Sequence, residues 1–466
     1  KNTVNGDVKI YFTLHAGESS KAEQNHHFTI SSTCVQKERM PTEIQVFPDY
    51  PGNQFLGLGG NFRLQNDVDP QVIDYCLEHL DIRMGRVEMP WDVWHPVDSI
   101  DPYQEAMAGR IDPHVAASLQ MAQRLHQQGM PVLLAVWYPP QWAVEGPLRR
   151  NPRHEDGTYG WGLREDKMEE IYHSIASYIR FLQDHYDVEV SMFSFNESDL
   201  GINVRQTDEE HTQLIKGLGG YLQAMGLSTG FLLGDTADAN GLGFVEDALK
   251  DPETWPYIKA LSFHSWRGCS DETLIEWYEA ADRLNVPLLV GEGSIDAAAW
   301  RYPEIFVEPH YALEEIKLYI RMLDICQVQS ILQWQLTADY SPLVGGGVFG
   351  NTNDELQPTR RFYNLKQLAS TPANMYVLPT NSSIEEDLYM VALADRKQKR
   401  FVFHLVNTGA SQKIVINGIP ERIRSLEVYA TDEVRKVEHI KTIQVSEQGS
   451  VELTVEEACF ISLMSI

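Results

Sequence analysis

Two acidic residues at the ends of apolar segments are the strongest chemical signal in this sequence. Glu197 follows the segment 188–195 and Asn196, and Glu292 follows the segment 286–291. A carboxylate at the end of a buried strand must be hydrogen-bonded, paired or used, because burying it without compensation is costly. Two carboxyl groups that face each other can cleave a glycosidic bond, one as acid and one as base or nucleophile.

The elements that would position these residues alternate between strand and helix from residue 50 to residue 370. Buried parallel strands read as continuous apolar runs, and we expect about eight of them, as in a (β/α)8 barrel. The strands are expected at 55–60, 82–89, 131–136, 188–195, 231–233, 260–263, 287–290 and 330–335. The helices are expected at 70–80, 113–128, 164–185, 212–225, 271–284, 311–326 and 358–370. A doubly wound open sheet is the alternative, although it usually has fewer strands.

Barrel geometry would bring the two glutamates together. Glu197 ends the fourth predicted strand and Glu292 ends the seventh, so both lie at the carboxyl face, where barrel enzymes carry their reactive groups. A separation of about 5 Å between the carboxyl groups would indicate a retaining hydrolase, whereas roughly 6.5–9.5 Å would indicate an inverting one.

The ends of the chain have a different pattern. After residue 372 the sequence reads as short strands joined by polar turns, which is typical of a β-sandwich. Strands are also expected at 8–14, 27–32 and 43–47, and we expect them to join this module. The predicted domains are therefore 1–46 and 372–466, which form the sandwich, and 47–371, which forms the barrel.

Composition excludes several classes of protein. The net charge of −28 disfavours a nucleic-acid partner, because phosphate binding needs clustered positive charge. The five cysteines are odd in number and include no CxxC pair, so they indicate neither a disulfide framework nor a metal site. No apolar run reaches transmembrane length. We find no dinucleotide fingerprint, metal-spaced His/Cys set or Gly-x-Ser-x-Gly elbow, and we expect no cofactor and no metal.

The motifs at the strand ends resemble clan A of the glycoside hydrolases, and more narrowly glycoside hydrolase family 30. The resemblance rests on Asn196-Glu197 with Glu292, and on the segments 58–62 (LGGNF), 86–90 (RVEMP) and 137–142 (WYPPQW). It runs from about residue 57 through the C-terminal module. Two positions depart from the family pattern, since Ser198 stands where proline is usual and Phe195 where glutamine is usual.

The resemblance implies a role for each matching residue. Glu197 would be the general acid/base, Glu292 the nucleophile, and Asn196 the partner of the substrate 2-hydroxyl. The other implied site residues are Arg86 beneath Glu292, His264 as a hydrogen-bonding partner of Glu292, Trp334 as the sugar floor, and Trp137 and Trp142 as walls. The implied substrate is an oligosaccharide or polysaccharide, met in an extracytoplasmic location.

Each of these residues also has a structural interpretation. Glu197 and Glu292 could each cap the helix after its strand, and His264 could be a hydrogen-bonded core histidine. Any single tryptophan is more often a core residue than a sugar platform. The remaining structural interpretations are a surface pairing of Arg86 with Glu88 or Asp92, and solvated loop positions for Asp235 and Asp238.

A basic cluster after the third strand bears on the substrate. Arg149, Arg150, Arg153 and His154 could receive an anionic sugar such as a uronic acid, although a solvated loop is the simpler interpretation. The sequence thus predicts a retaining hydrolase that cleaves a β-linked glycan by double displacement. The alternatives are a non-catalytic carbohydrate-binding barrel and an inverting glycosidase.

Overall fold

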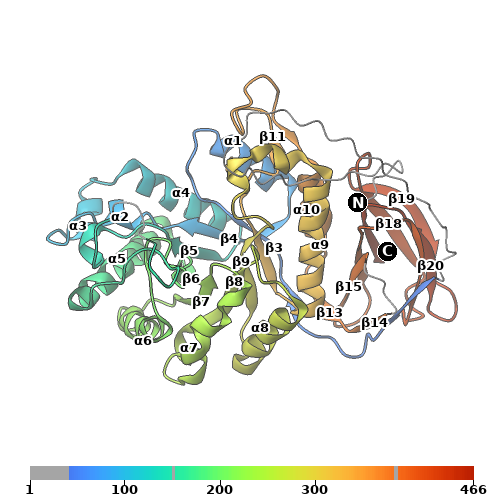
Figure 1. Ribbon diagram of the computed structural model, residues 1–466, viewed down its shortest axis with the longest axis horizontal. Coiled ribbons are helices and arrows are strands. Elements are labelled where there is room, and N and C mark those ends of the chain that lie inside the picture. Colours follow the sequence, from blue (N-terminus) through green and yellow to red (C-terminus); the bar gives the residue numbers. More distant parts are fainter. Residues whose placement is uncertain (1–40, 149–152, 383–386, 466) are drawn as a thin grey trace, which may run out of the picture.

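A closed barrel of parallel strands forms the larger part of the molecule (Figure 1). The computed structural model describes residues 41–148, 153–382 and 387–465. The barrel order is β10 (Ser330–Gln333), β3 (Gly57–Asn61), β4 (Ile82–Glu88), β5 (Val132–Val136), β6 (Val190–Phe195), β7 (Gly230–Thr236), β8 (Ile258–His264) and β9 (Leu288–Gly293), with β9 pairing back to β10. The predicted barrel is confirmed, and the open-sheet alternative is wrong because β9 and β10 close the ring.

The barrel interior is filled by one layer of side chains beneath the strand ends. The layer consists of Met84, Leu133, Met192, Leu232, Ala260, Leu289 and Leu332. The strand β3 contributes Gly59, where a Cβ atom would lie 2.8 Å from Leu332 Cγ. This glycine is therefore required by packing, and the filled layer gives the functional groups above it a rigid base.

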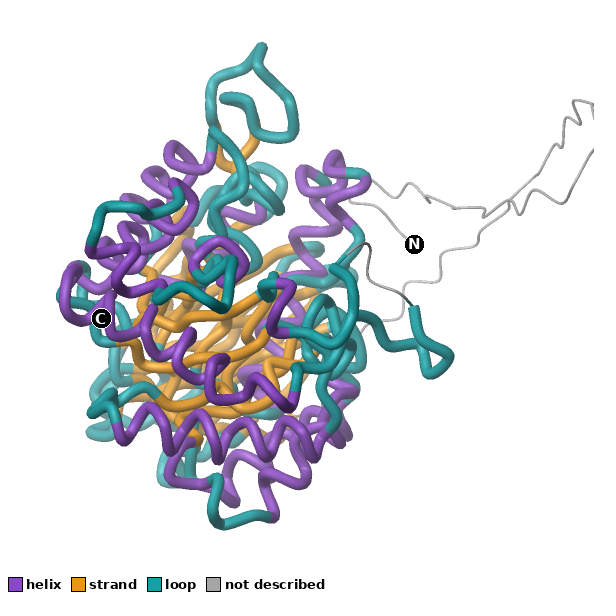
Figure 2. The backbone as a smooth tube through the Cα atoms, turned by 90° about the vertical axis from the view of Figure 1, so that its left-hand side faces the viewer, coloured by secondary structure: helices purple, strands orange, loops and turns teal. Residues whose placement is uncertain are grey.

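Helices surround the strands, as the tube view shows (Figure 2). They are α1 (Asp69–His79), α4 (Pro113–Gln127), α5 (Met168–Tyr186), α6 (Asp208–Ala224), α8 (Asp271–Leu284), α9 (Pro309–Ile325) and α10 (Arg360–Ala369), with short α2 (Trp91–Trp94), α3 (Pro102–Met107) and α7 (Glu246–Lys250). Local signals set their ends. Thr207 and Glu210 form a reciprocal capping box at the start of α6, and Asn285 ends α8 in the left-handed conformation.

Two packed sheets form the second module, which confirms the predicted β-sandwich. One sheet has the order β19-β18-β21-β16-β15-β13-β2, and the other β14-β1-β17-β20. The strands are β1 (Thr42–Val46), β2 (Gln54–Phe55), β13 (Met375–Leu378), β14 (Thr380–Ser382), β15 (Leu388–Asp395), β16 (Phe401–Asn407), β17 (Gln412–Asn417), β18 (Ser425–Thr431), β19 (Glu438–Gln444), β20 (Val451–Val455) and β21 (Cys459–Ser465). The strand β1 pairs with β14 and β17, whereas the segments 8–14 and 27–32 lie outside the described residues.

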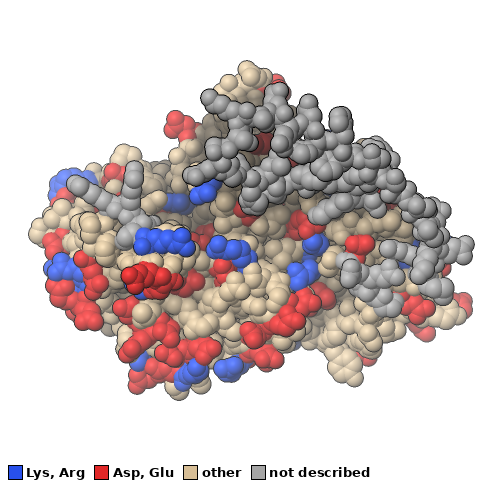
Figure 3. Space-filling view, in the orientation of Figure 1, with Lys and Arg blue, Asp and Glu red and all other residues tan. Residues whose placement is uncertain are grey.

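Helices α9 and α10 lie between the barrel and the sandwich (Figure 1). Gln367 of α10 donates from Nε2 to the Phe460 carbonyl at 3.2 Å and to the Ser462 hydroxyl at 2.9 Å. Acidic side chains outnumber basic ones on the visible face of the barrel (Figure 3), in keeping with the net charge of −28. Within the described ranges, no helix combines the length and apolar character needed to cross a membrane.

Candidate active site

The candidate catalytic residues all lie at one end of the barrel. Glu197 stands two residues after the end of β6, and Glu292 is the second-last residue of β9. His264 is the last residue of β8, and Arg86 and Asp235 lie near the ends of β4 and β7. Because parallel barrel strands share one carboxyl face, five different strands deliver these side chains to the same place.

The two glutamates face each other across His264. One carboxylate oxygen of Glu197, one of Glu292 and a ring nitrogen of His264 lie within 4.8 Å of one another. The Nδ1 atom of His264 lies 3.1 Å from Glu197 Oε1 and 3.4 Å from Glu292 Oε2. The side chain of Glu197 is 13% exposed and that of Glu292 is 4% exposed. Glu197 therefore has better access to solvent protons than Glu292.

Arg86, on β4, forms hydrogen bonds to residues on or directly after four other strands beneath the glutamates. Its side chain is fully buried, and its two terminal nitrogens each donate to two oxygens. The acceptors are Asn61 Oδ1 at 2.9 Å, Glu292 Oε1 at 3.0 Å, Asn196 Oδ1 at 2.6 Å and Asp235 Oδ2 at 2.7 Å. The structural alternative of a surface pairing for Arg86 is wrong, because Glu88 pairs instead with Arg63 at 2.9 Å.

Asp235 is the member of this network that the sequence reading missed. Its carboxylate is completely buried and accepts hydrogen bonds from Arg86, from Ser194 Oγ at 2.7 Å and from His264 Nε2 at 3.1 Å. The interpretation of Asp235 as a solvated loop acid is therefore wrong. Asp238, three residues later, instead pairs with the exposed Arg267 at 2.9 Å. The sequence signal for a buried Asp235 was the apolar segment before it, which resembles the one before Glu197.

The charges in this network shift one another's protonation. Burial alone would lower the pKa of His264, but the carboxylates of Glu292, Asp235 and Glu197 raise it to about 10. His264 is therefore an imidazolium at neutral pH, and both ring nitrogens donate. Burial would raise the pKa of Asp235, yet Arg86 and His264 hold it well below its usual range. Burial also raises the pKa of Glu292, while His264 and Arg86 act against this rise.

The backbone is in the left-handed conformation at both Glu197 and Asp235, with φ of 50° and 47°. This region is uncommon for residues other than glycine, asparagine and aspartate, and it costs roughly 1–3 kcal/mol. The amide of Glu197 donates to the Asp235 carbonyl at 3.1 Å, so a hydrogen bond joins the two left-handed residues. This conformation turns the Glu197 side chain toward His264 and Glu292.

Tryptophans border the network on one side. The rings of Trp137 and Trp334 lie 5.9 Å apart, and the guanidinium carbon of Arg86 lies 4.6 Å from the centre of the Trp137 ring. Both tryptophans belong to an aromatic cluster with Trp266 and Tyr340. The predicted wall and floor residues Trp137 and Trp334 therefore lie near the candidate catalytic network, which is the group Arg86, Asn196, Glu197, Asp235, His264 and Glu292.

Four other predicted residues lie elsewhere or are not described. The indole of Trp142 donates to the His95 carbonyl at 2.7 Å, and its ring packs on Trp91. His154 contacts the Gly160 carbonyl at 2.7 Å. Arg149 and Arg150 lie outside the described residues, so an anionic-sugar site at this loop stays a prediction.

A metal ion has one potential site among the described residues, which is the group Glu197, His264 and Glu292. A histidine that ligates a metal must offer an unprotonated ring nitrogen. The raised pKa of His264 means that a metal would have to displace a proton held between three carboxylates. The donor set therefore fits an organic substrate better than a resident metal.

Solved structures with this fold include several glycoside hydrolases. A family 30 endoxylanase from Clostridium papyrosolvens superposes with a TM-score of 0.72 at 16% identity, over 91% of this chain and 99% of that chain. A family 30 subfamily 8 xylanase from Clostridium acetobutylicum gives 0.72 at 13% identity, over 91% and 99%. An endo-β-1,6-glucanase gives 0.61 at 13% identity, over 91% and 94%.

These likenesses establish that the chain has the fold of family 30 glycoside hydrolases, including the side sandwich. No protein-family model matches the sequence, and no curated protein sequence matches it. The resemblance predicted from the sequence is thereby confirmed for the fold, and the chemistry rests on the residues at the strand ends.

Proposed function

We propose that this protein is a retaining glycoside hydrolase that cleaves a β-linked glycan by double displacement. The observation that carries the proposal is the distance between Glu197 and Glu292, whose nearest carboxylate oxygens lie within 4.8 Å of each other. A retaining enzyme places its two carboxyl groups about 5–5.5 Å apart, because the nucleophile attacks the sugar directly. An inverting enzyme needs room for a water molecule between them.

The two glutamates divide the work. Glu292, hydrogen-bonded to Arg86, attacks the anomeric carbon while Glu197 donates its proton to the departing glycosidic oxygen. This forms a glycosyl ester on Glu292 and releases the aglycone as an alcohol. Glu197, now a carboxylate, removes a proton from water, and the resulting hydroxide displaces Glu292 and restores both groups.

The surrounding residues prepare these steps. Arg86 acts against the rise in the pKa of Glu292 that burial causes, and it also fixes Asn196, whose amide then lies beside the sugar to contact its 2-hydroxyl. His264 donates from Nδ1 to Glu197 at 3.1 Å and forms an ion pair with Glu292 at 3.4 Å, so it lies between the two carboxylates. Trp137 and Trp334 supply aromatic surface, on which the apolar face of a pyranose packs.

The fold neighbours support an oligosaccharide or polysaccharide as the substrate, since two are described as endoxylanase or xylanase and one as an endo-β-1,6-glucanase. Polymers of this kind lie outside the cytoplasm, so we also propose an extracytoplasmic location. The β-linkage is part of the proposal.

The test is turnover of a panel of aryl β-glycosides by the native protein and by Glu292→Gln and Glu197→Gln. The change at Glu292 should abolish turnover, because the amide cannot form the ester. The change at Glu197 should reduce hydrolysis of poor leaving groups by about 10²–10⁴-fold. Activated leaving groups, which need no proton, should be affected much less.

Proton NMR of the first-formed sugar then decides the stereochemistry. A β-anomer as the first product supports retention, and an α-anomer would establish inversion. If the native protein turns over no glycoside or polysaccharide in the panel, the barrel is a binding protein and the proposal fails.

A further inference from the structure

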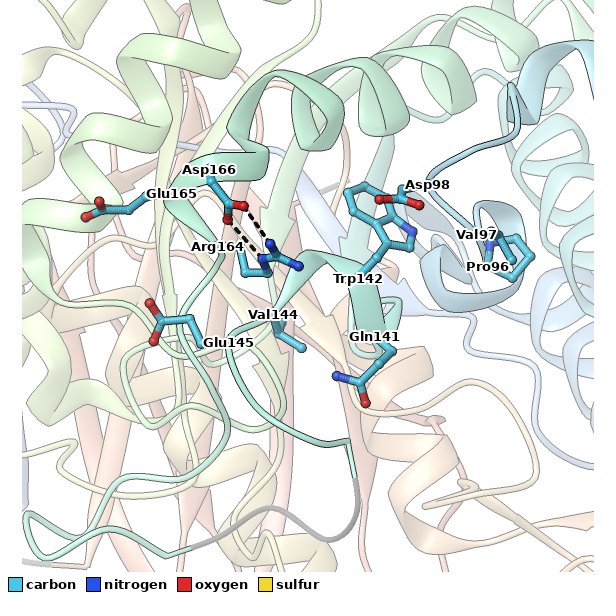
Figure 4. A pocket seen from close by; sticks show the side chains of 10 residues that line it. All are labelled: Pro96, Val97, Asp98, Gln141, Trp142, Val144, Glu145, Arg164, Glu165 and Asp166. Carbon is cyan, nitrogen blue, oxygen red and sulfur yellow. Dashed lines mark hydrogen bonds and ion pairs between the residues drawn. The ribbon is translucent and has the colours of Figure 1, made fainter.

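A hollow of about 870 Å³ opens among the loops that follow β4 and β5, and Figure 4 shows the side chains that line it. Its walls are residues 96–98 after β4, residues 141, 142, 144 and 145 after β5, and residues 164–166 before α5. These connections leave the carboxyl ends of strands, as do Glu197 and Glu292. None of the residues of the catalytic network lines this hollow.

Trp142 forms the aromatic wall of the hollow and is held in place from behind. Its indole nitrogen donates to the His95 carbonyl, and its ring lies 4.8 Å from the His95 ring and 6.1 Å from that of Trp91. Trp91 in turn lies 5.8 Å from Phe195, next to Asn196. A part-exposed indole whose orientation is already fixed loses little entropy when a ligand stacks on it. The rings of Trp142, Trp91 and Phe195 therefore form a chain of contacts from the hollow to the residue before Asn196.

Polar groups line the rest of the hollow. Arg164 and Asp166 form a two-bond ion pair at 2.9 and 2.5 Å, and Figure 4 places this pair on one side of Trp142 and Asp98 on the other. Among the described residues, neither Glu145 nor Glu165 has an ion-pair partner. Their carboxylate oxygens can therefore accept hydrogen bonds from hydroxyl groups of a ligand.

The charge of the lining decides the class of ligand. Four carboxylates, Asp98, Glu145, Glu165 and Asp166, line the hollow together with one guanidinium, from Arg164, and Lys167 pairs with Asp98 at 2.9 Å from outside the lining. This excess of negative charge repels uronic acids and other anions. A resident metal ion is disfavoured as well, because the group of acids and histidines able to hold one within the described ranges lies at the catalytic network.

We propose that this hollow is a second glycan site, which binds a segment of neutral polysaccharide outside the catalytic centre. A pyranose face stacks on Trp142, and ring hydroxyls donate to Glu145 and Glu165. The inference rests on the proposed function in one respect: the bound polymer is also the substrate. The site holds the polymer at the barrel face and so raises its local concentration at Glu197 and Glu292.

The test measures binding without turnover. In a Glu292→Gln background, affinity electrophoresis is run through gels that contain neutral arabinoxylan, β-1,6-glucan or polygalacturonate. Two variants address the hollow: Trp142→Ala removes the wall, and Val97→Trp fills the space from a position that is 49% exposed. The matched control is Trp255→Ala, because Trp255 is 45% exposed and precedes β8 at the opposite end of the barrel.

We expect both hollow variants to weaken binding of a neutral polymer by about three- to tenfold, and the control to bind as the parent does. Polygalacturonate should not retard the parent protein. Unchanged retardation in Val97→Trp would overturn the inference even if Trp142→Ala fails to fold. Stronger retardation by polygalacturonate than by the neutral polymers would overturn it too.

Kinetics in the otherwise native protein separate this inference from the proposed function. The KM for polymer should rise in Val97→Trp more than the KM for an aryl glycoside, which is short enough to occupy the catalytic centre alone. Equal loss on both substrates would place the effect at the catalytic centre and contradict a separate site. Absence of any turnover by the native protein would refute the proposed function, while the electrophoresis would still report on the hollow.

Discussion

Replacing Asp235 with Asn tests whether the buried charge network is organised as the contacts indicate. The change keeps the shape of the side chain and removes one negative charge from a position with no solvent exposure. It weakens the bonds from Arg86 at 2.7 Å and from His264 at 3.1 Å. Breaking a buried ion pair by removing one partner costs about 3–5 kcal/mol, because the remaining charge is left uncompensated.

The pH dependence of the Asp235→Asn variant follows from His264. In the native protein, carboxylates raise the pKa of His264 to about 10, against about 6.5 in the unfolded chain. The stabilisation from protonated His264 is therefore complete below pH 6.5 and is lost as pH rises toward 10. Without the Asp235 charge the pKa of His264 falls, so the variant loses stability and activity at a lower pH within this window.

The assays are urea unfolding at pH 7 and pH 9, and kcat/KM for an aryl glycoside from pH 5 to pH 10. The control is Asp238→Asn, in which a nearby carboxylate paired with an exposed arginine is neutralised. We expect the control to change the free energy of unfolding by about 0.5 kcal/mol or less. If kcat/KM declines at the same alkaline pH in the native and Asp235→Asn proteins, and the free energy of unfolding is unchanged, the reasoning is refuted.

Two further changes test packing and burial. Gly291→Ala should cost about 1–3 kcal/mol and lower kcat/KM, because the new Cβ atom would lie 2.2 Å from Asp235 Oδ1 and 2.7 Å from Ser262 Oγ. Gly243→Ala is its control, since no heavy atom lies within 4 Å there, and equal unfolding midpoints for the two variants would contradict this packing. Burial lowers the pKa of His404 to about 3, so below pH 6.5 protonation of the unfolded chain should destabilise the sandwich by about 1.4 kcal/mol per pH unit. Urea unfolding between pH 7 and pH 4 should therefore show that the free energy of unfolding depends less on pH in His404→Gln than in the native protein. Equal pH dependence in the two proteins would show that His404 is not the cause.

The fold was predictable because the barrel strands are apolar on both faces and the helices carry local end signals. The predicted ends of helices and strands are wrong where polar residues form part of the helix or strand. The helix expected from residue 212 begins at Asp208, since its first turn is acidic and solvent-facing. The strand expected at 231–233 extends from Gly230 to Thr236, because Gly234 and Asp235 read locally as a turn.

That the candidate residues Arg86, Asn196, Glu197 and Glu292 lie together was predictable, because each stands at or near a strand end. Asp235 was missed because nothing in its own segment identifies its partners. The donors to its carboxylate come from β4, β6 and β8, which are far from it in the sequence. Only the closed barrel brings them together, so its burial is a tertiary property.

The balance of charge in the buried network supports the division of roles between the two glutamates. Arg86 and His264 carry two positive charges, and Asp235 and Glu292 carry two negative ones. With these four ionised the cluster is electrically neutral. Glu197 is also the more exposed of the two glutamates, and it contacts His264 but not Arg86 among the described residues. Arg86 and His264 both contact Glu292 and act against the rise in its pKa that burial causes, whereas Glu197 faces solvent more and contacts one cation, so the contacts place Glu292 as the nucleophile and Glu197 as the acid.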